Sequence, residues 1–590
     1  MKKKTIIWIV VAALAICAAV AAFMFAFNGE QTEEKAENVR MGTDIFTTSK
    51  GVSSKGVVSK GAASQGASVI VYADLNQLAE KGAFDSYLAD IRKLFASVIS
   101  AELGGGKEAK QLKEIVTDLD ALGIDTEKPV CCYLSEEMTE FVIIASVLDA
   151  DKLDNSVELL SYFLEESGEE GIDVRNQGGV RIIDDEYYAV AYNASAIAFT
   201  AGQNGADINV AKNAIAAQVD LSKFAGKDLA VMVYVDSLMK ASEISMNATL
   251  DMYEEWYEEG YISKSEYNDI KKAYAEYEEA VKECDKYFEP NANIMFSLTF
   301  DMGRATFACD VEGVKNNEYM ESFKSVNLEH LNNLSKDVYA VMGMGVNGER
   351  FAKYLEEYLT DDVLKSLGIR PTSEVRMAMS IASDALSSID GDITVALDSI
   401  DGTFEWYYDS YWDEYDYDPV VNSVEAMLMV DVNDSYIISN VGQFAGGFLD
   451  KIDKNHYSLY YDGYLFSLGQ DNNVLYAGVN MEPEAKRRSA MNADWVKDVE
   501  GSVSYMVVDI DAILSNNFIC ELLDDATNAS YQERELIYGI LDKFSYAYIA
   551  SNLTSSELVL VFDDQKTNAL EQISDALLPF LIDECVENLY

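Results

Sequence analysis

The sequence has little histidine, little proline and little positive charge. Of 590 residues, 2 are His and 6 are Pro, and 45 Lys and Arg stand against 101 Asp and Glu, which gives a formal net charge of -56. Nucleic-acid binding depends on Lys and Arg that neutralise phosphates, so this balance excludes nucleic acid as a partner. An anionic bilayer surface would repel the same body. We interpret the charge mainly as an aid to solubility.

The common catalytic and metal-binding motifs are also missing. His330 and His456 are far apart and show no HExxH or HxH spacing, so no zinc site is predicted and both are expected on the surface. No GxSxG, GxxxxGK[ST] or GxGxxG motif occurs. We therefore assign no catalytic residue, no metal ligand and no cofactor. Pairs such as Asp361 and Asp362 are too common in so acidic a chain to mark glycoside-type chemistry, which stays open.

The 7 cysteines are scattered along the chain and form no CxxC pair. Disulfides form in chains exported from the cytoplasm, so bridges between Cys284 and Cys309, or between Cys520 and Cys585, are left open. Core packing of free thiols is the expected role of most cysteines, because no spacing marks a disulfide framework.

One long apolar run lies at the N-terminus. Three lysines at positions 2–4 precede an uncharged segment from Ile6 to Phe27. At about 1.5 Å per residue, this segment can span a hydrocarbon core of about 30 Å as a helix. The lysines favour the cytoplasmic side, which sends the rest of the chain outside. We predict a signal anchor over residues 1–27 and a single-pass protein of the cell membrane whose body lies outside the cytoplasm.

Two alternatives to an anchor are less favoured. A cleaved secretory peptide would have an apolar core of about 7–15 residues, whereas this run continues past Cys17 to Phe27. The sequence Leu14-Ala15-Ile16-Cys17 resembles a lipobox, but Ile16 is larger than the residue that normally precedes the lipidated cysteine. A secreted form and a lipoprotein therefore come second to the anchor.

A short sequence pattern, a buried strand followed by a polar cap and a helix, occurs four times. VIVYADL ends near Asp74, AVMVYVDSL contains Asp236, and VSYMVVDIDAIL contains Asp509, while Asn347 holds the capping position in the fourth copy. Asp74 and Asp236 are 162 residues apart (236 − 74), and so are Asn347 and Asp509 (509 − 347). We interpret this equal spacing as a tandem duplication with an offset of 273 residues (347 − 74).

The predicted fold class is α+β, with duplicated units of antiparallel sheet plus helix behind an N-terminal transmembrane helix. Alternating strands joined by Asp, Asn and Gly turns support the sheets. Ser263 and Glu266 form a capping box that predicts a helical hairpin around Gly260. The expected segments are a flexible Ser/Lys/Gly linker over residues 28–66, a first half over 67–334 (67–222 and 223–334) and a second half over 335–590 (335–495 and 496–590).

The segment from Asp401 to Pro419 occurs only in the second half and is expected to lengthen a hairpin loop. Clustered exposed aromatic residues mark interaction sites, so we predict a binding loop for a protein or a glycan. The alternative, in which the aromatic side chains pack on the neighbouring sheet, is left open, and no EF-hand spacing supports Ca²⁺. The aromatic residues are Trp406, Tyr407, Tyr408, Tyr411, Trp412, Tyr415 and Tyr417.

The patterns VIVYADL and AVMVYVDSL, on a duplicated body behind a membrane signal, resemble uncharacterised bacterial envelope proteins classed as a domain of unknown function. The resemblance covers most of residues 67–590 and implies no activity and no functional residue. We expect a membrane-tethered extracytoplasmic protein that acts in binding or assembly at the cell envelope. The alternative is an envelope hydrolase that uses acidic residues, with glycans as substrates. Whether the chain is an enzyme stays open, and the binding role is favoured.

Overall fold

The computed structural model describes most of the chain beyond residue 68. The anchor predicted over residues 1–27 and the linker predicted over 28–66 lie outside the described residues. None of the described helices is both long enough and apolar enough to cross a membrane. The described residues are 69–84, 110, 119–134, 140–166, 171–185, 188–202, 206–216, 221–284, 286–315, 319–366, 368–409, 414–433, 438, 448–484, 487–527 and 531–589.

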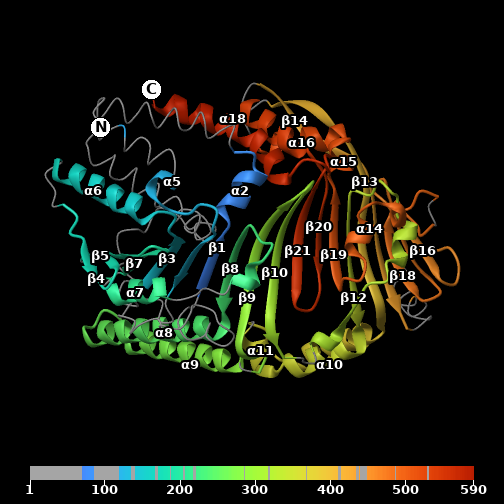
Figure 1. Ribbon diagram of the computed structural model, residues 1–590. Helices are drawn as coiled ribbons and strands as arrows, with labels where there is room; N and C mark the ends of the chain where they lie inside the picture. The colour runs from blue at the N-terminus through green and yellow to red at the C-terminus, as the bar shows by residue number, and fades with distance from the viewer. Residues whose placement is uncertain are drawn as a thin grey trace. The chain divides into compact units, whose positions relative to one another are not determined.

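Contacts within the chain define two units. Unit 1 comprises residues 1–300 and 311–315, and unit 2 comprises residues 301–310 and 316–590. Each unit combines antiparallel strands with helices (Figure 1). The α+β class expected from the sequence is confirmed at this level. The domain boundaries expected after residues 222, 334 and 495 stay predictions.

In unit 1 the described strands pair in the order β9-β8-β1-β2-β3-β7-β6-β5-β4, and every pair is antiparallel. The strands are β1 (Val69–Ala73), β2 (Val130–Leu134), β3 (Glu140–Ser146), β4 (Arg175–Gln177), β5 (Val180–Asp184), β6 (Tyr188–Tyr192), β7 (Ala196–Gly202), β8 (Leu229–Tyr234) and β9 (Phe288–Asp301). The helices are α2 (Leu75–Lys81), α5 (Leu119–Leu122), α6 (Ala150–Glu166), α7 (Ile208–Ala216), η2 (Leu221–Phe224), α8 (Val235–Glu258) and α9 (Lys264–Cys284).

The main core of unit 1 lies on one face of this sheet. Side chains alternate across a strand, so Ile70 and Tyr72 of β1 reach the same face, where Tyr72 stacks on Phe224 with ring centroids 5.1 Å apart. Helix α7 covers this face and buries Val210, Ala211, Ala214 and Ile215 against it.

The helical hairpin predicted in unit 1 is confirmed. Helices α8 and α9 are separated by Gly260, which has a φ of +81°. The Ser263 N–H donates to Glu266 Oε2 at 2.7 Å, and the Glu266 N–H donates to Ser263 Oγ at 3.3 Å. Hydrogen bonds from the backbone N–H and the side chain of Ser263 to the charged carboxylate lower the pKa of Glu266. The capping box therefore starts α9 as the sequence indicates.

In unit 2 the described strands pair in the order β10-β21-β20-β19-β12-β13-β14-β18-β17-β16-β15, again antiparallel throughout, and β11 also pairs with β12. The strands are β10 (Arg304–Val314, of which 304–310 belong to unit 2), β11 (Phe323–Lys324), β12 (Ala340–Asn347), β13 (Ile389–Asp409), β14 (Glu414–Val432), β15 (Asp450–Lys451), β16 (His456–Tyr461), β17 (Tyr464–Asp471), β18 (Val474–Val479), β19 (Ser504–Asp509), β20 (Phe544–Ser551) and β21 (Ser555–Phe562).

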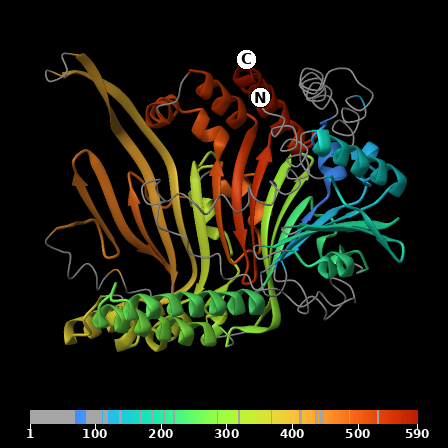
Figure 2. The same cartoon turned by 90° about the vertical axis from the view of Figure 1, so that its left-hand side faces the viewer.

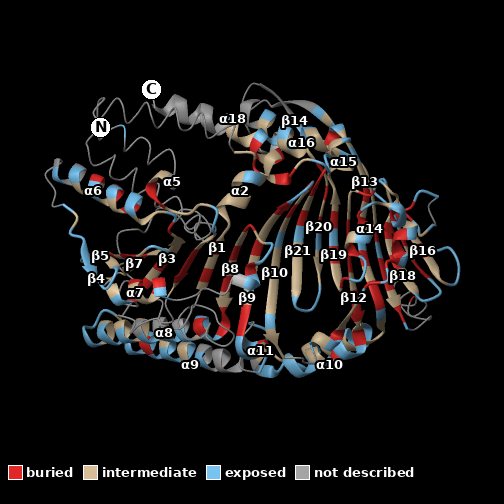
Figure 3. Cartoon of the chain, in the orientation of Figure 1, coloured by how far each residue is buried: buried red, intermediate tan, exposed pale blue. Residues whose placement is uncertain are grey.

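The helices of unit 2 stand at the ends of these strands and over one face of the sheet. Short elements over the core face bury Leu331, Trp495 and Val499 against Val341 and Val507. Residues along the central strands alternate between buried and more exposed classes (Figure 3). The helices are η3 (Met320–Ser322), η4 (Glu329–Asn333), α10 (Gly348–Tyr358), α11 (Asp361–Ser366), α12 (Ser373–Ser387), η5 (Ala490–Asn492), α14 (Val496–Val499), α15 (Ile510–Leu514), α16 (Asn517–Thr527), α17 (Tyr531–Leu541) and α18 (Ala569–Leu589).

The strand order is the same in the two units. Strands β9-β8-β1-β2-β3-β7-β6-β5-β4 of unit 1 match β20-β19-β12-β13-β14-β18-β17-β16-β15 of unit 2 one for one in chain order. Unit 2 continues beyond β20 with β21 and part of β10.

Three of the four predicted helix caps are present. Side-chain oxygens of Asp74, Asn347 and Asp509 each accept the backbone N–H three residues further on, at 3.0, 3.2 and 2.8 Å. The expectation was wrong for Asp236, because α8 begins one residue earlier and Asp236 lies in its first turn, where it accepts the N–H of Asn291. The bridges left open for Cys309 and Cys520 are absent, since both are free thiols.

We expect Asp509→Ala to lower the free energy of unfolding by about 1 kcal/mol, because the first turn of α15 loses its side-chain acceptor. Asp509→Asn keeps an oxygen in the same place and serves as the matched control, with most of the stability retained. Urea unfolding followed by circular dichroism measures both. Equal stabilities for the Ala and Asn variants would show that the cap contributes nothing.

Candidate functional site

The aromatic segment of unit 2 is a paired two-stranded ribbon. The prediction of a loop between Asp401 and Pro419 was wrong. Strands β13 and β14 pair through most of this segment, from Gly402 opposite Val421 to Asp409 opposite Glu414. Only residues 410–413 at the turn lie outside the described residues. The ribbon extends past the other strands of unit 2 (Figure 2). Many Asp residues and Pro419 are typical of loops, and the strand pairing depends on a register that the sequence alone does not show.

The register brings four of the predicted aromatic positions together across the ribbon. Directly opposed residues of an antiparallel pair are the units that interact in a sheet. The paired positions are Trp406 with Tyr417, and Tyr408 with Tyr415. The other three predicted positions are Tyr407, which is opposite Asp416, and Tyr411 and Trp412, which lie outside the described residues.

The base of β13 in the ribbon is fixed to helix α16. The rings of Phe404 and Phe518 lie with centroids 5.5 Å apart, and the Asn516 side chain donates a 2.6 Å hydrogen bond to the carbonyl of Ile400. A Cβ on Gly402 would lie 2.4 Å from the ring of Phe518, so this close approach requires glycine. The strand therefore leaves the sheet in a fixed direction.

The base of β14 is held by two other side chains. The hydroxyl of Tyr464 donates to the carbonyl of Val421 at 3.0 Å, and the Asn480 amide donates to the carbonyl of Val424 at 2.9 Å. These bonds fix β14 to β17 through Tyr464 and to the end of β18 through Asn480. Both strands of the ribbon therefore start from fixed positions. Binding residues are typically held by a rigid scaffold, so this arrangement favours a binding element over a flexible loop.

Beyond its base, the ribbon has two open edges. Strand β12 pairs with β13 only as far as Leu397, and β18 pairs with β14 only from Ala426 onward. In the described part of the chain no other strand joins the ribbon past these points. Open edges present unpaired backbone N–H and C=O groups, which can accept an added strand or other hydrogen-bonding partner.

Like charges lie opposite each other on the ribbon. Glu405 is opposite Asp418, and both are exposed, while the register also places Asp409 opposite Glu414. Directly opposed like charges destabilise a strand pair by a few tenths of a kcal/mol up to about 1 kcal/mol. A basic or cationic partner would relieve this repulsion. These pairs could not be found in the sequence, because they depend on the register.

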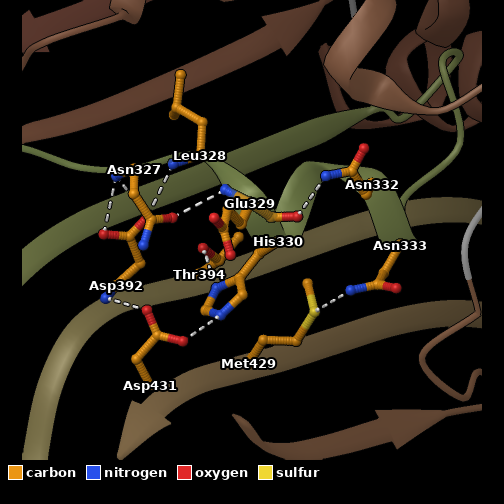
Figure 4. A network of polar contacts seen from close by, with 10 residues as sticks. All are labelled: Asn327, Leu328, Glu329, His330, Asn332, Asn333, Asp392, Thr394, Met429 and Asp431. Atoms are coloured by element: carbon orange, nitrogen blue, oxygen red, sulfur yellow. Dashed lines mark hydrogen bonds and ion pairs between the residues drawn. The ribbon is translucent and has the colours of Figure 1, made fainter. Parts of the chain in front are cut away.

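A second polar cluster in unit 2 is centred on His330, which is 2% exposed (Figure 4). Its Nε2 lies 3.0 Å from Asp431 Oδ1, and its Nδ1 lies 2.9 Å from Thr394 Oγ1. The Asp392 carboxylate accepts the N–H of Leu328 at 3.0 Å and so holds Leu328 at a φ of +62°. The cluster fixes η4 to strands β13 and β14.

The charges of this cluster are compensated within the protein. Burial raises the pKa of Asp392 despite the backbone N–H groups that it accepts. Burial also acts on Asp431, but hydrogen bonds from His330 and from the Asp392 amide outweigh it and lower the pKa of Asp431. The surface position expected for His330 was wrong, because two carboxylates and a hydroxyl from distant strands enclose it. We interpret the cluster as structural.

His456 stands in a more open acidic setting. Its Nδ1 lies 2.8 Å from Asp453 and its Nε2 lies 3.1 Å from Asp471. The hydrogen bond to Asp453, with support from Asp471, raises the pKa of His456 above 6.5. Among the described residues, no group of three or more His, Cys, Asp and Glu side chains is arranged to hold a metal ion.

Comparison with known families places the chain. The sequence profile of DUF4836, a domain of unknown function, matches residues 63–570. The chain belongs to the DUF4836 family. The expected resemblance to an uncharacterised family is thereby confirmed, and the DUF4836 match runs from just before β1 to the start of α18.

Likenesses to solved structures are distant. Crystal form I of TP0453 is similar with a TM-score of 0.20 and 11% identity, over 44% of the DUF4836 chain and 81% of the other chain. Crystal form IV of TP0453 gives a TM-score of 0.20 and 11% identity, over 42% and 77%. At these values the likeness carries no argument about function. No curated protein matches the DUF4836 chain.

The raised pKa of His456 predicts a pH-dependent stability of the DUF4836 chain. Protonated His456, paired with Asp453 and Asp471, stabilises the folded protein. This contribution to the free energy of unfolding is fully present below pH 6.5 and is lost as the pH rises through the raised pKa of the folded state. We expect His456→Gln to destabilise the protein most below pH 6.5 and progressively less above the raised value. Denaturant unfolding at a series of pH values measures the difference, and a difference that does not change with pH contradicts it.

Proposed function

We propose that this protein is a membrane-tethered extracytoplasmic binding or assembly protein of the bacterial cell envelope, and that the β13–β14 ribbon is its binding element. The observation that carries the proposal is the ribbon, which continues in register beyond its neighbouring strands with aromatic and acidic residues interleaved. Past Leu397 on β13 and before Ala426 on β14, neither strand of the ribbon has a second described strand beside it. We infer from its interleaved aromatic and acidic residues that the ribbon binds a partner.

The chemistry of the ribbon limits the partner. Aromatic residues supply large contact area with few rotatable bonds, and they are enriched at the centres of interfaces. The opposed carboxylates at Glu405 and Asp418 favour a partner that brings positive charge. A protein with basic side chains fits both features, and a glycan fits the aromatic feature alone. The hydrolase alternative stays a prediction, and no contact in the described residues favours it.

We also propose that the two units arose by duplication. The support is the shared strand order together with the caps Asp74 and Asn347, which follow the matching strands β1 and β12 and lie 273 residues apart (347 − 74). Unit 2 differs where strands β13 and β14 are much longer than β2 and β3 of unit 1. The extra length is the ribbon, so the binding element belongs to the second copy.

Removal of the ribbon aromatics should abolish binding without loss of stability. The double variant Trp406→Ser/Tyr417→Ser changes one opposed pair, and we expect a change of less than about 0.5 kcal/mol in the free energy of unfolding. With the full chain as bait in envelope extracts, the proteins or glycans recovered with wild type should be missing with this variant, as mass spectrometry would show.

The matched control is Tyr460→Ser/Tyr461→Ser, at the end of β16 in the same unit, where the two tyrosines are 71% and 69% exposed. This variant removes exposed aromatic surface away from the ribbon and should capture the same partners as wild type. If both variants behave like wild type, the ribbon is not the binding element.

The tether is tested separately. Without residues 1–27 the chain should move from the membrane fraction to the soluble fraction, because the acidic body has no attraction to an anionic bilayer. Alkaline carbonate extraction of membranes distinguishes an integral from a peripheral form. Full-length chain that carbonate releases into the supernatant would contradict the anchor.

A further inference from the structure

The sheet of unit 2 has a second face that is apolar and open. On the side opposite the core, one residue from each of six adjacent strands lies in a single row, each directly opposite the next in register. All six are between 37% and 52% exposed. The row consists of Leu558, Ile549, Met506, Met342, Val395 and Leu428.

The rows two residues to either side extend this surface with half-buried residues, apart from Val430, which is buried. Together with β18, which adds Ala477 opposite Leu428, the three rows cover seven strands from β21 to β18 and contain no charged residue. Their polar members are three serines at one corner, Ser504, Ser551 and Ser556. We call these three rows the apolar face. In a chain that is 25% charged, so large a charge-free surface is unlike an ordinary solvated face.

The backbone beneath the apolar face offers nothing to a polar ligand. The strands from β20 to β14 each pair with neighbours on both sides, so their N–H and C=O groups are used within the sheet. A glycan or an extended peptide would bury its own polar groups here without partners, which is unfavourable. The surface therefore suits an equally apolar surface.

We infer that a second copy of this chain packs its own apolar face against this one. A seven-strand face three rows deep measures about 34 by 20 Å, or close to 700 Å², at the usual strand spacing of about 4.8 Å. Stable interfaces bury about 800 Å² per partner, so the area is of the size that a dimer needs. Two sheets pack face to face about 10 Å apart, and a second copy supplies the identical, complementary surface.

The symmetry of such a dimer specifies its centre. Strand β12 is the middle one of the seven strands, and Met342 is the middle residue of its three positions on the apolar face. The central row continues beyond Leu558 to Phe307 of β10, which is 41% exposed, so its centre lies beside Met342 and Met506. In an isologous dimer the twofold axis passes near the centre of the shared patch. Met342 of one copy therefore faces Met342 of the other. The net charge of -56 on each copy adds like-charge repulsion around the interface, so salt should strengthen association.

The test is site-specific photo-crosslinking of the full chain in membranes. With p-benzoylphenylalanine in place of Met342, irradiation should give a covalent dimer of twice 65.4 kDa. Adding Met506→Glu should reduce the product about tenfold by burying a charge at the interface. Raising the salt from about 0.05 to about 0.5 M should increase the product.

The control carries the same photo-crosslinker in place of Met377, which is 67% exposed on α12 of the same unit, and should give no dimer. Circular dichroism and thermal unfolding establish that Met506→Glu remains folded. The inference is overturned if the probe at position 342 gives only monomer, or crosslinks only to lipid or to other proteins. It is equally overturned if positions 342 and 377 give the same yield of dimer.

Discussion

The antiparallel hydrogen-bond ladder of unit 2 sets the position of everything else in that unit. Register fixes the direction of every side chain, because successive residues of a strand point to opposite faces. One set, which includes Val341 and Val507, is buried under η4, η5 and α14, while Met342 and Met506 on the other face stay open. A slip of one residue would exchange these sets. The same ladder, continued past Leu397 with two strands alone, becomes the ribbon.

Local features of the fold could be predicted from the sequence. Asp74, Asn347 and Asp509 cap helices because a short polar side chain after a buried strand can accept a free N–H. The Ser263 and Glu266 capping box follows the same logic. The structure confirms these predictions, because each depends on residues within one turn of each other, where the chain itself brings the partners together.

Features that join distant segments could not be predicted. The cluster around His330 requires Asp392 and Asp431, which lie 62 (392 − 330) and 101 (431 − 330) residues further along the chain. Pro419 is typical of loops, yet it fits in β14, since among the described strands β14 has no second neighbour at that point. The apolar face forms only when six pairs of neighbouring strands each have the observed register, so the sequence of any one strand does not predict it.

Hydrogen–deuterium exchange measures directly how much more readily the ribbon opens than the central strands of unit 2. A two-stranded ribbon is only marginally stable by itself, whereas central strands open only when the unit unfolds. Amides of residues 405–409 and 414–418, beyond the fixed base, should therefore exchange about a thousandfold faster than those of β12 and β19 in the absence of a partner. Equal protection of the ribbon and of β12 would contradict the view that the ribbon is a free element built to bind.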